Sequence, residues 1–235
     1  MIDALLALAE SKPAYGFKLM FLTLRRQGHH WNHKRVYRIY RMLNLNLRRK
    51  HKRRLPGRDP EPLSVPEDVN QAWSADFMSD ALMGGRRFRT FNVVDDFNRE
   101  ALAIEIDLNL PARRVVRVLD RIAETRGYPG QLRLDNGPEF ISICLADWAE
   151  QHGVHLEFIQ PGKPTQNALI ERFNRTYRTE VLDMYLFERL SEVREHTETW
   201  LTEYNQERPH QSLDHMTPVD YRVHHHPETS NLGWH

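Results

Sequence analysis

Three acidic residues stand where the surrounding sequence is apolar or is about to turn. Asp76 interrupts the apolar segment 73–78, and Asp135 follows segment 131–134 directly before an Asn-Gly turn. Glu171 lies five residues into an expected helix. Carboxylates that converge raise one another's pKa unless a cation neutralises them, and oxygen ligands suit Mg²⁺ or Mn²⁺. The three acids therefore predict a site at which two such ions, about 3.5–4 Å apart, act on a phosphodiester.

Each of these acids also has a simpler structural explanation. An aspartate at a strand end commonly forms a turn, and a glutamate on a helix is commonly solvated. Asp95 and Asp96 compete with Asp76 for the first ligand position. They end a strand beside Asn98 and Arg99, so turn formation accounts for them well. Spacing alone leaves the choice open.

Charge is divided unevenly along the chain, although the formal net charge is only +1. Residues 1–60 hold 15 Lys and Arg but 3 Asp and Glu, whereas residues 61–235 hold 18 and 29. This division is typical of a polyanion-binding module joined to a module with another task. The run 48–54 contains no acid, and bound phosphates would relieve the repulsion between its cations. The cations of this run expected to contact DNA are Arg48, Arg49, Lys50, Lys52, Arg53 and Arg54.

The composition excludes several classes of protein. Hydrophobic residues make up 40% and charged residues 28% of the 235 residues, which is ordinary for a globular protein. No apolar run reaches the roughly 18 residues that a membrane span needs, and the apolar start lacks the basic region of a signal peptide. The single cysteine, Cys144, excludes an internal disulfide framework. We expect a cytoplasmic protein without a membrane partner.

The N-terminal part of the chain shows helical periodicity. Segments 15–28 and 32–43 carry apolar residues at spacings of three and four. They form either a helix-turn-helix-like unit or a plain helical hairpin with a basic face. In both cases Arg35 and Arg38 would lie on the solvent side of the second helix and contact phosphates. Residues 55–70 are rich in proline and predict a linker.

Beyond this linker, strand-like and helical segments follow one another. Three strands are expected first, and then helices and strands in turn, which implies a mixed sheet with helices on its faces. The expected strands are 73–78, 88–97, 101–107, 131–134 and 155–159, and the expected helices are 113–126, 139–152, 166–182 and 190–205.

The sequence around the acids resembles the OrfB-type transposases of bacterial insertion sequences. The catalytic core of that family is similar to that of retroviral integrases and has an RNase H-like fold. In the family 35 residues separate the second acid from the third, and 35 separate Asp135 from Glu171 here. The resemblance covers roughly residues 10–222. Its blocks are WSADF at 73–77, NVVDD at 92–96, RLDNGPEF at 133–140, PGKPTQNALIERFN at 161–174 and YNQERPHQSL at 204–213.

The resemblance implies an α/β chain, with an RNase H-like mixed sheet flanked by helices and preceded by a small all-helical basic module. It implies a DDE-type polynucleotidyl transferase whose catalytic and metal-binding triad is Asp76, Asp135 and Glu171, with two Mg²⁺ or Mn²⁺ ions. The expected reaction is divalent-metal-dependent strand cleavage and 3′-hydroxyl strand transfer at the ends of an insertion sequence. The expected divisions are a DNA-binding module at 1–54, a linker at 55–70, a catalytic core at 71–222 and a flexible tail at 223–235.

Polar residues around the start of the Glu171 helix are the candidate DNA contacts of the core, because a helix N-terminus favours phosphate. These candidates are Lys163, Gln166, Asn167 and Arg172. Asn167 could instead cap the helix, and Arg172 could pair with a neighbouring acid. His210 could contact DNA or support the core. The histidine tract 224–226 fits a flexible tail better than a metal site.

Double-stranded DNA, as terminal repeats and as target, is the implied partner, and a homo-oligomer is expected on DNA. Family members are often fused to an upstream reading frame, so an upstream-frame protein with a helix-turn-helix and a leucine zipper is a further expected partner. Two other functions stay open, since fold does not fix function. One is a catalytically silent DNA-binding or assembly subunit, against which the three acids argue. The other is a nuclease of the RNase H type acting on RNA–DNA hybrids, against which the basic module argues.

Overall fold

A computed structural model describes residues 1–47, 66–137, 139–159 and 167–227 of the chain. Its N-terminal part consists of the helices α1 (Ile2–Ser11), α2 (Phe17–Arg26) and α3 (His33–Met42). The latter two confirm the helices expected from the sequence, and α1 precedes them. The three helices enclose a small core of their own, made of Leu5, Leu8, Tyr15, Met20, Leu24, Val36 and Tyr40. The basic run 48–54 and residues 55–65 of the expected linker lie outside the described residues.

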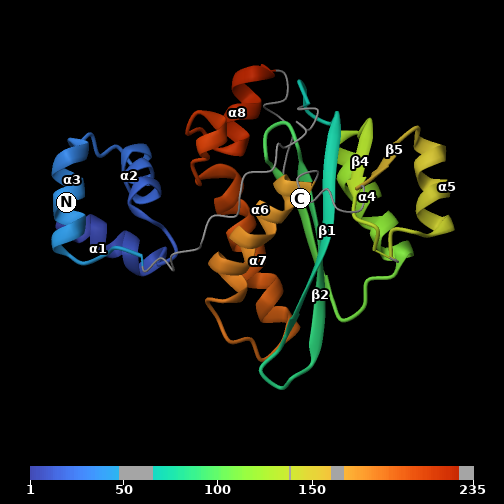
Figure 1. Ribbon diagram of the computed structural model, residues 1–235, viewed down its shortest axis with the longest axis horizontal. Coiled ribbons are helices and arrows are strands. Elements are labelled where there is room, and N and C mark those ends of the chain that lie inside the picture. Colours follow the sequence, from blue (N-terminus) through green and yellow to red (C-terminus); the bar gives the residue numbers. More distant parts are fainter. Residues whose placement is uncertain (48–65, 138, 160–166, 228–235) are drawn as a thin grey trace, which may run out of the picture.

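The second part is built on a five-stranded mixed sheet in the order β3-β2-β1-β4-β5, as Figure 1 shows for its central strands. The strands β1 (Ala72–Ala81), β2 (Arg87–Asp95) and β3 (Ala101–Asp107) are antiparallel. The strands β4 (Gln131–Leu134) and β5 (His155–Phe158) run parallel to β1. The mixed sheet expected from the sequence is confirmed, and β1 extends three residues further than expected.

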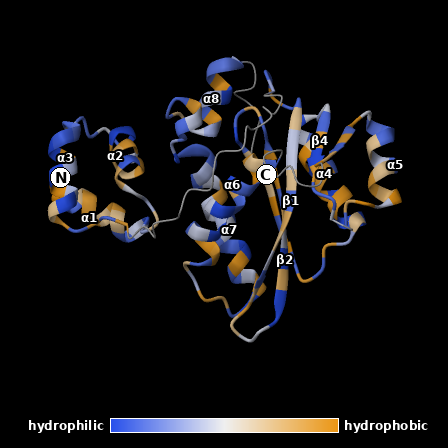
Figure 2. Cartoon of the chain, in the orientation of Figure 1, coloured by the Kyte–Doolittle hydropathy of each residue, from blue (hydrophilic) through white to orange (hydrophobic). Residues whose placement is uncertain are grey.

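Helices cover both faces of this sheet. On one face, α4 (Ala112–Arg126) and α5 (Ile143–His152) pack over Trp73 and Ala75 of β1. On the other face, α6 (Ala168–Tyr177), the π-helical segment Arg178–Leu182 and α7 (Leu190–Gln206) pack over Met78. Figure 2 shows that these helices carry both hydrophobic and hydrophilic residues. Because side chains alternate along a strand, Asp76 belongs to the face covered by α6 and α7.

Three segments differ from the sequence-based expectation. α5 begins at Ile143 rather than at residue 139, because the Ser142 hydroxyl caps it by accepting a hydrogen bond from Leu145 N–H at 3.3 Å. The expected helix 166–182 continues after Tyr177 as a π-helical segment. Residues 223–225 form the last turn of α8 (Pro218–His225) rather than part of a flexible tail. The buried Arg222, which is ion-paired with Glu100 at 3.2 Å, fixes this helix to the core.

The helices of the N-terminal part contact α7, α8 and the loop after α7. Arg26 Nη1 lies 2.6 Å from Asp220 Oδ2, and Lys12 pairs with Glu203. Tyr15 is buried, and its ring lies 5.8 Å from the Arg208 guanidinium. The two ion pairs join basic residues of the N-terminal part to acidic residues of the core, so the uneven division of charge also contributes to holding the two parts together.

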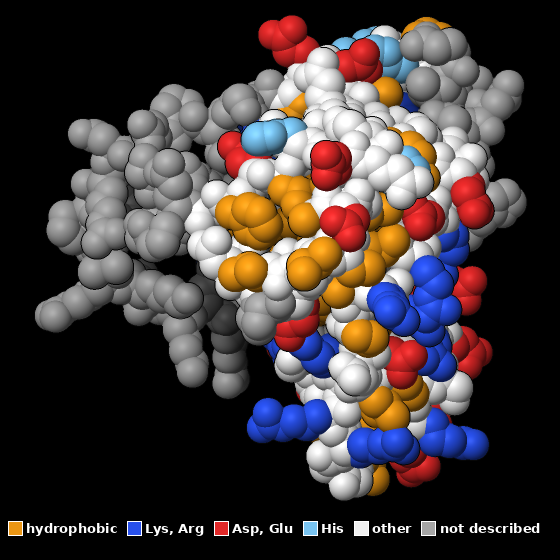
Figure 3. All heavy atoms as spheres, turned by 90° about the vertical axis from the view of Figure 1, so that its right-hand side faces the viewer, with side chains coloured by type: hydrophobic (Ala, Val, Ile, Leu, Met, Phe, Trp, Pro, Cys, Tyr) orange, Lys and Arg blue, Asp and Glu red, His pale blue; other side chains and the backbone are white. Residues whose placement is uncertain are grey.

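The outer surface of the core is not uniformly acidic. Figure 3 shows the side of the molecule that carries α5, where exposed hydrophobic side chains gather in the upper half and Lys and Arg side chains in the lower half. Ile141 and Ile143, at the start of α5, are both exposed. Among the described residues, no helix is at once long enough and apolar enough to cross a lipid bilayer.

Candidate active site

The sheet register brings Asp76 and Asp135 next to each other. Ser74 of β1 pairs with Arg133 of the parallel strand β4. Continuing this register by two residues places Asp76 opposite Asp135, and paired residues of adjacent strands point to the same face of a sheet. The register thus brings two carboxylates that are 59 positions apart in the sequence toward one another, and the charge of Asp135 contributes to the pKa of Asp76.

A chain of amide hydrogen bonds connects Asp76 to the helix that bears Glu171. Asn92 Nδ2 donates to Asn174 Oδ1 at 2.6 Å, and Asn174 Nδ2 donates to Asp76 Oδ2 at 2.7 Å. Asn174 lies three residues after Glu171 on α6, so both side chains lie on the same side of the helix. Asn174 faces β1, and the charge of Glu171 contributes to the pKa of Asp76.

The charges of Asp135 and Glu171 both contribute to the pKa of Asp76. Burial first, and then the negative charges of Asp135 and Glu171, raise the pKa of Asp76 to about 6. The hydrogen bonds from the Phe77 N–H and from Asn174 oppose this rise without cancelling it. Burial and neighbouring negative charges destabilise the ionised form of a carboxyl, and a bound cation would stabilise that form.

The turn after β4 fixes the Asp135 side chain through a hydrogen bond to the backbone. Gly137 N–H donates to Asp135 Oδ1 at 2.9 Å. A Cβ atom at position 137 would lie 2.8 Å from the same oxygen, so only glycine allows this approach. The neighbouring acid Glu139 differs from Asp76 because it is paired with Arg89, whose hydrogen bond holds the pKa of Glu139 below its usual range.

Asp95 and Asp96, the competing candidates for the first ligand position, are engaged in the fold. Asp95 accepts hydrogen bonds from the backbone N–H groups of Asn70 at 2.9 Å and Phe97 at 2.8 Å. Burial raises the pKa of Asp95 to about 7. Asp96 accepts from Ser74 Oγ at 2.6 Å and from Arg133 Nη1 at 2.7 Å. These partners favour Asp76 as the acid available to a ligand.

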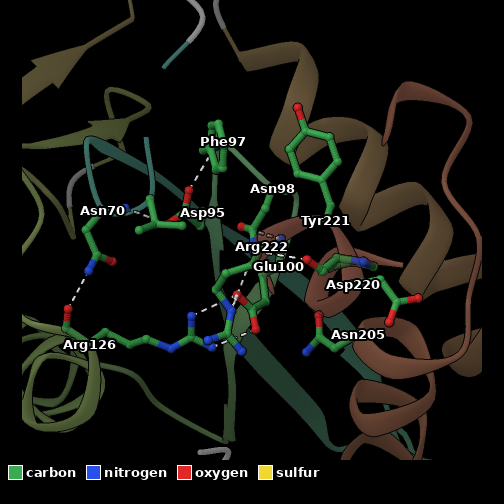
Figure 4. A network of polar contacts seen from close by, with 12 residues as sticks. Asn70, Asp95, Phe97, Asn98, Glu100, Arg126, Asn205, Asp220, Tyr221 and Arg222 are labelled. Carbon is green, nitrogen blue, oxygen red and sulfur yellow. Dashed lines mark hydrogen bonds and ion pairs between the residues drawn. The ribbon is translucent and has the colours of Figure 1, made fainter. Parts of the chain in front are cut away.

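Asp95 lies beside a larger buried polar network that joins the β2–β3 turn to three helices (Figure 4). Glu100, which is fully buried, accepts two hydrogen bonds from Arg126 of α4 at 2.7 and 2.8 Å. It also accepts from Asn98 at 2.7 Å and pairs with Arg222 of α8. Asn205 of α7 accepts from Ala101 N–H at 2.9 Å. This network has a structural role, because its buried acidic and basic side chains pair with one another inside the fold.

The three acids supply oxygen ligands of the kind that a divalent cation prefers, but they are not gathered into a metal-binding cluster in this structure. Among the described residues, no group of three or more His, Cys, Asp or Glu side chains is gathered closely enough to hold a metal ion. Asp76 and Asp135 are partly buried, whereas Glu171 is exposed. Residues 160–166, which lead into α6, lie outside the described residues. The donor set contains only oxygen atoms, and the raised pKa of Asp76 fits a site for Mg²⁺ or Mn²⁺.

The candidate DNA contacts are placed as follows. Arg35 and Arg38 are exposed on α3, opposite the buried Val36 and Tyr40. Arg172 is exposed on α6, and no ion pair of it with an acid is found among the described residues, which disfavours the pairing alternative. Asn167 occupies the N-cap position of α6 but makes no capping hydrogen bond with its side chain. Lys163, Gln166 and the run 48–54 lie outside the described residues.

The histidines singled out in the sequence lie within the folded structure. His210 Nε2 is buried without a hydrogen-bond partner in the described part of the chain. Burial, followed by the charge of Arg208, lowers the pKa of His210 to about 3, so its ring is neutral. In the 224–226 tract, His225 Nδ1 lies 2.9 Å from the Tyr221 carbonyl oxygen, and His226 Nε2 lies 3.0 Å from Asp68 Oδ1.

The sequence-based reasoning missed Asn92 and Asn174, which position Asp76. Asn92 lies in a strand that is otherwise buried, and an amide is costly there unless it is hydrogen-bonded. Asn174 recurs three residues after Glu171, on the same side of the helix. Both signals were present in the sequence, but only the sheet register shows that the two amides meet.

Models of known families match the chain in three places. An integrase core domain matches residues 66–164, an integrase core domain matches residues 152–218, and an HTH-like domain matches residues 3–53. The last match favours the helix-turn-helix-like interpretation of the N-terminal part over a plain hairpin.

Curated relatives come from bacterial insertion elements. The chain is 42% identical over 221 residues to a 31.7 kDa protein of insertion element IS407 from Burkholderia multivorans, covering 94% of this chain and 80% of that protein. It is 38% identical to a 39.2 kDa protein of IS476 from Xanthomonas euvesicatoria, covering 97% of this chain but 66% of that protein. It is 24% identical to the transposase of IS904 from Lactococcus lactis, covering 90% of this chain and 88% of that protein.

Solved structures show the same fold at low identity. A chain of the simian T-cell lymphotropic virus intasome superposes with a TM-score of 0.57 at 14% identity, covering 95% of this chain and 74% of that chain. The HTLV-2 integrase catalytic core domain in complex with magnesium gives a TM-score of 0.51 at 14% identity, covering 66% and 98%. The mixed sheet with flanking helices is therefore that of a retroviral integrase core, as the sequence predicted.

Proposed function

Because the chain belongs to the insertion-sequence transposases with an integrase core domain, we propose that it cleaves DNA strands at the ends of its element and joins the freed 3′-hydroxyl to target DNA. The proposed catalytic residues are Asp76, Asp135 and Glu171. The observation that supports this assignment is the position of Asp76, where burial and, to a smaller extent, the charges of Asp135 and Glu171 raise its pKa to about 6.

Two Mg²⁺ or Mn²⁺ ions per site are the proposed cofactor, with the three carboxylates as ligands. When bound, the ions would lower the pKa of the attacking water or 3′-hydroxyl and stabilise the charge that develops on the phosphodiester. The chain itself supplies the geometry of the ligands. Asn174 and the Phe77 N–H orient Asp76, and Gly137 N–H orients Asp135. These hydrogen bonds limit the rotation of the two aspartate side chains before a cation binds.

The basic N-terminal module, proposed at residues 1–54, would hold DNA for the core, proposed at residues 71–222. Arg35 and Arg38 of α3 are exposed and are the proposed phosphate contacts in the described part of this module. Near the site, Asn167 and Arg172 are the proposed contacts, together with Lys163 and Gln166. We propose that the active species is a multimer on paired DNA ends.

A strand-transfer assay with labelled element ends tests the assignment. Asp135→Asn should abolish metal-dependent cleavage and joining, while binding of the same DNA in chelator stays within about twofold of the unmodified chain. Strand transfer by this variant at the normal rate would refute the triad. Assaying the chain alone and with an upstream-frame protein tests whether that partner is needed. Strand transfer measured over a range of Mg²⁺ concentrations distinguishes an enzyme from a silent assembly subunit. A silent subunit would give no strand-transfer product at any Mg²⁺ concentration.

A further inference from the structure

A cavity of about 280 Å³ lies on the side of α6 opposite the acids. Leu169, Arg172 and Thr176 of α6 line it, whereas Glu171 and Asn174 point to the other side of the helix. The remaining walls come from the β2–β3 turn, α7 and the segment after α7. The polar side chains among its lining residues are Arg99, Arg172, Thr176, Tyr204, Arg208, His210, Gln211 and Ser212, and no described acid lines the cavity.

Two of the cations that line this cavity lack a neutralising partner. Arg208 is paired with Glu180 at 2.9 Å. For Arg99 and Arg172, no carboxylate lies within ion-pair distance among the described residues. Arg99 donates to the Asp96 carbonyl through Nη1. Burial lowers the pKa of Arg99, the charges of Asp96 and Asp95 oppose this decrease, and the charge of Arg172 adds to it. Two arginines that repel each other around a cavity create a positive potential there.

Buried polar atoms at the cavity also lack partners. Arg99 Nε and His210 Nε2 are buried and make no hydrogen bond within the described part of the chain. His210 donates to the Tyr204 carbonyl with its other ring nitrogen, so Nε2 of this neutral ring is an acceptor and does not favour an anion. Arg99 Nε is therefore the unpartnered donor at the cavity. An unsatisfied buried donor or acceptor costs roughly 1–3 kcal/mol. Such groups are usually satisfied by a ligand or by water, so the cavity is built to receive a polar group.

We propose that this cavity binds a phosphate group of the DNA strand that passes Glu171. Guanidinium groups match the geometry of phosphate oxygens and can donate two parallel hydrogen bonds. Arg172 follows Glu171 directly in the sequence, so a phosphate held by Arg172 and Arg99 fixes the strand on one side of α6 while the acids act on the other. The choice of DNA as the source of the phosphate rests on the proposed function. Free inorganic phosphate offers the same oxygen atoms, so the experiment has to distinguish it from the phosphates of DNA.

Two variants test the cavity without disturbing the core, because Arg172 and Ser212 are both exposed. Arg172→Gln removes a cation, and Ser212→Asp places a carboxylate at the cavity. Arg117→Gln removes an exposed arginine from α4, on the other face of the sheet, and is the matched control. Binding of a fluorescent DNA duplex to the full chain is measured by anisotropy in chelator over a range of KCl concentrations.

Both cavity variants should weaken DNA binding about threefold to tenfold and lower the slope of log K against log salt by about 0.9, as expected for one lost phosphate contact. Arg117→Gln should change neither. Ser212→Asp should also raise the unfolding temperature, because its carboxylate supplies the missing negative charge. A merely structural disturbance would lower that temperature.

A thermal-shift titration with inorganic phosphate tells whether the cavity binds a DNA phosphate or a free phosphate ion. Stabilisation by phosphate that both cavity variants lose, together with weakened DNA binding, supports the proposal. Stabilisation with unchanged DNA affinity would overturn the DNA assignment in favour of a free anion. DNA affinity and phosphate response equal to those of the control would overturn the site. Since these measurements exclude metal, failure of strand transfer would count against the proposed function and not against the cavity.

Discussion

Replacing Asp76 by Asn should stabilise the metal-free protein, although Asp76 is a proposed catalytic residue. Its pKa rises from 3.8 to about 6 on folding, and each unit corresponds to about 1.4 kcal/mol. The folded state therefore binds more protons than the unfolded state between about pH 4 and pH 6, and stability falls as the pH rises through this window. By about pH 7 the ionised carboxyl costs roughly 3 kcal/mol.

The amide avoids this cost but loses one hydrogen bond. Asp76 accepts from the Phe77 N–H and from Asn174 with different oxygens, and Asn offers one acceptor oxygen. Losing one such bond costs about 1 kcal/mol, so the net gain is about 1–2 kcal/mol. For a chain of this size each kcal/mol shifts the unfolding temperature by about 2–4 °C.

Urea and thermal unfolding in chelator, followed by circular dichroism at several pH values, measure this effect. Asp147→Asn, which replaces an exposed acid on α5, is the matched control and should change stability by less than about 0.5 kcal/mol. The gain from Asp76→Asn should vanish below about pH 4, where both states hold the proton. Addition of Mg²⁺ should make the unmodified chain the more stable of the two, because it alone keeps all three carboxylate ligands. A variant less stable than the unmodified chain near neutral pH in chelator would refute the electrostatic reasoning.

Three further predictions concern other parts of the structure. Gly137→Ala should lower the rate of strand transfer roughly tenfold to hundredfold with little change in DNA affinity, because its Cβ would displace the Asp135 carboxylate; unchanged kinetics would show that this carboxylate tolerates the shift. Glu100→Gln should cost roughly 3–5 kcal/mol in urea unfolding, because it leaves two buried arginines without their counter-charge, whereas the exposed Glu198→Gln should cost almost nothing. Asn32→Ala should destabilise α3 by about 1 kcal/mol, because the Asn32 side chain accepts hydrogen bonds from two backbone N–H groups at the start of that helix; hydrogen exchange of the α3 amides should quicken, and unaltered exchange would count against the cap.

Much of the fold was predictable from local patterns. The strands 101–107 and 131–134 were predicted with the bounds that the structure shows, because alternation and flanking turn residues mark them clearly. α8 was not predicted, since its short amphipathic pattern carries little signal. Its position depends on Arg222, which reaches Glu100 more than a hundred residues earlier in the chain. Long-range pairs of this kind leave no trace in local periodicity.

For the candidate site, too, some features follow from the local sequence and others only from the tertiary structure. Local properties made Asp76 and Asp135 candidates for divalent-cation chemistry, because Asp76 interrupts an apolar segment and Asp135 follows another directly before a turn. The resemblance to insertion-sequence transposases singled out Asp76 rather than Asp95, and only the structure shows that Asp95 is fully buried whereas Asp76 is partly exposed. Residue type and spacing are fixed when the chain is synthesised, whereas strand register and helix placement are fixed only when the core packs. The sequence therefore determined which acids are candidates for this chemistry, and the tertiary structure decided which of them are fully buried with partners in the fold and which stay partly accessible.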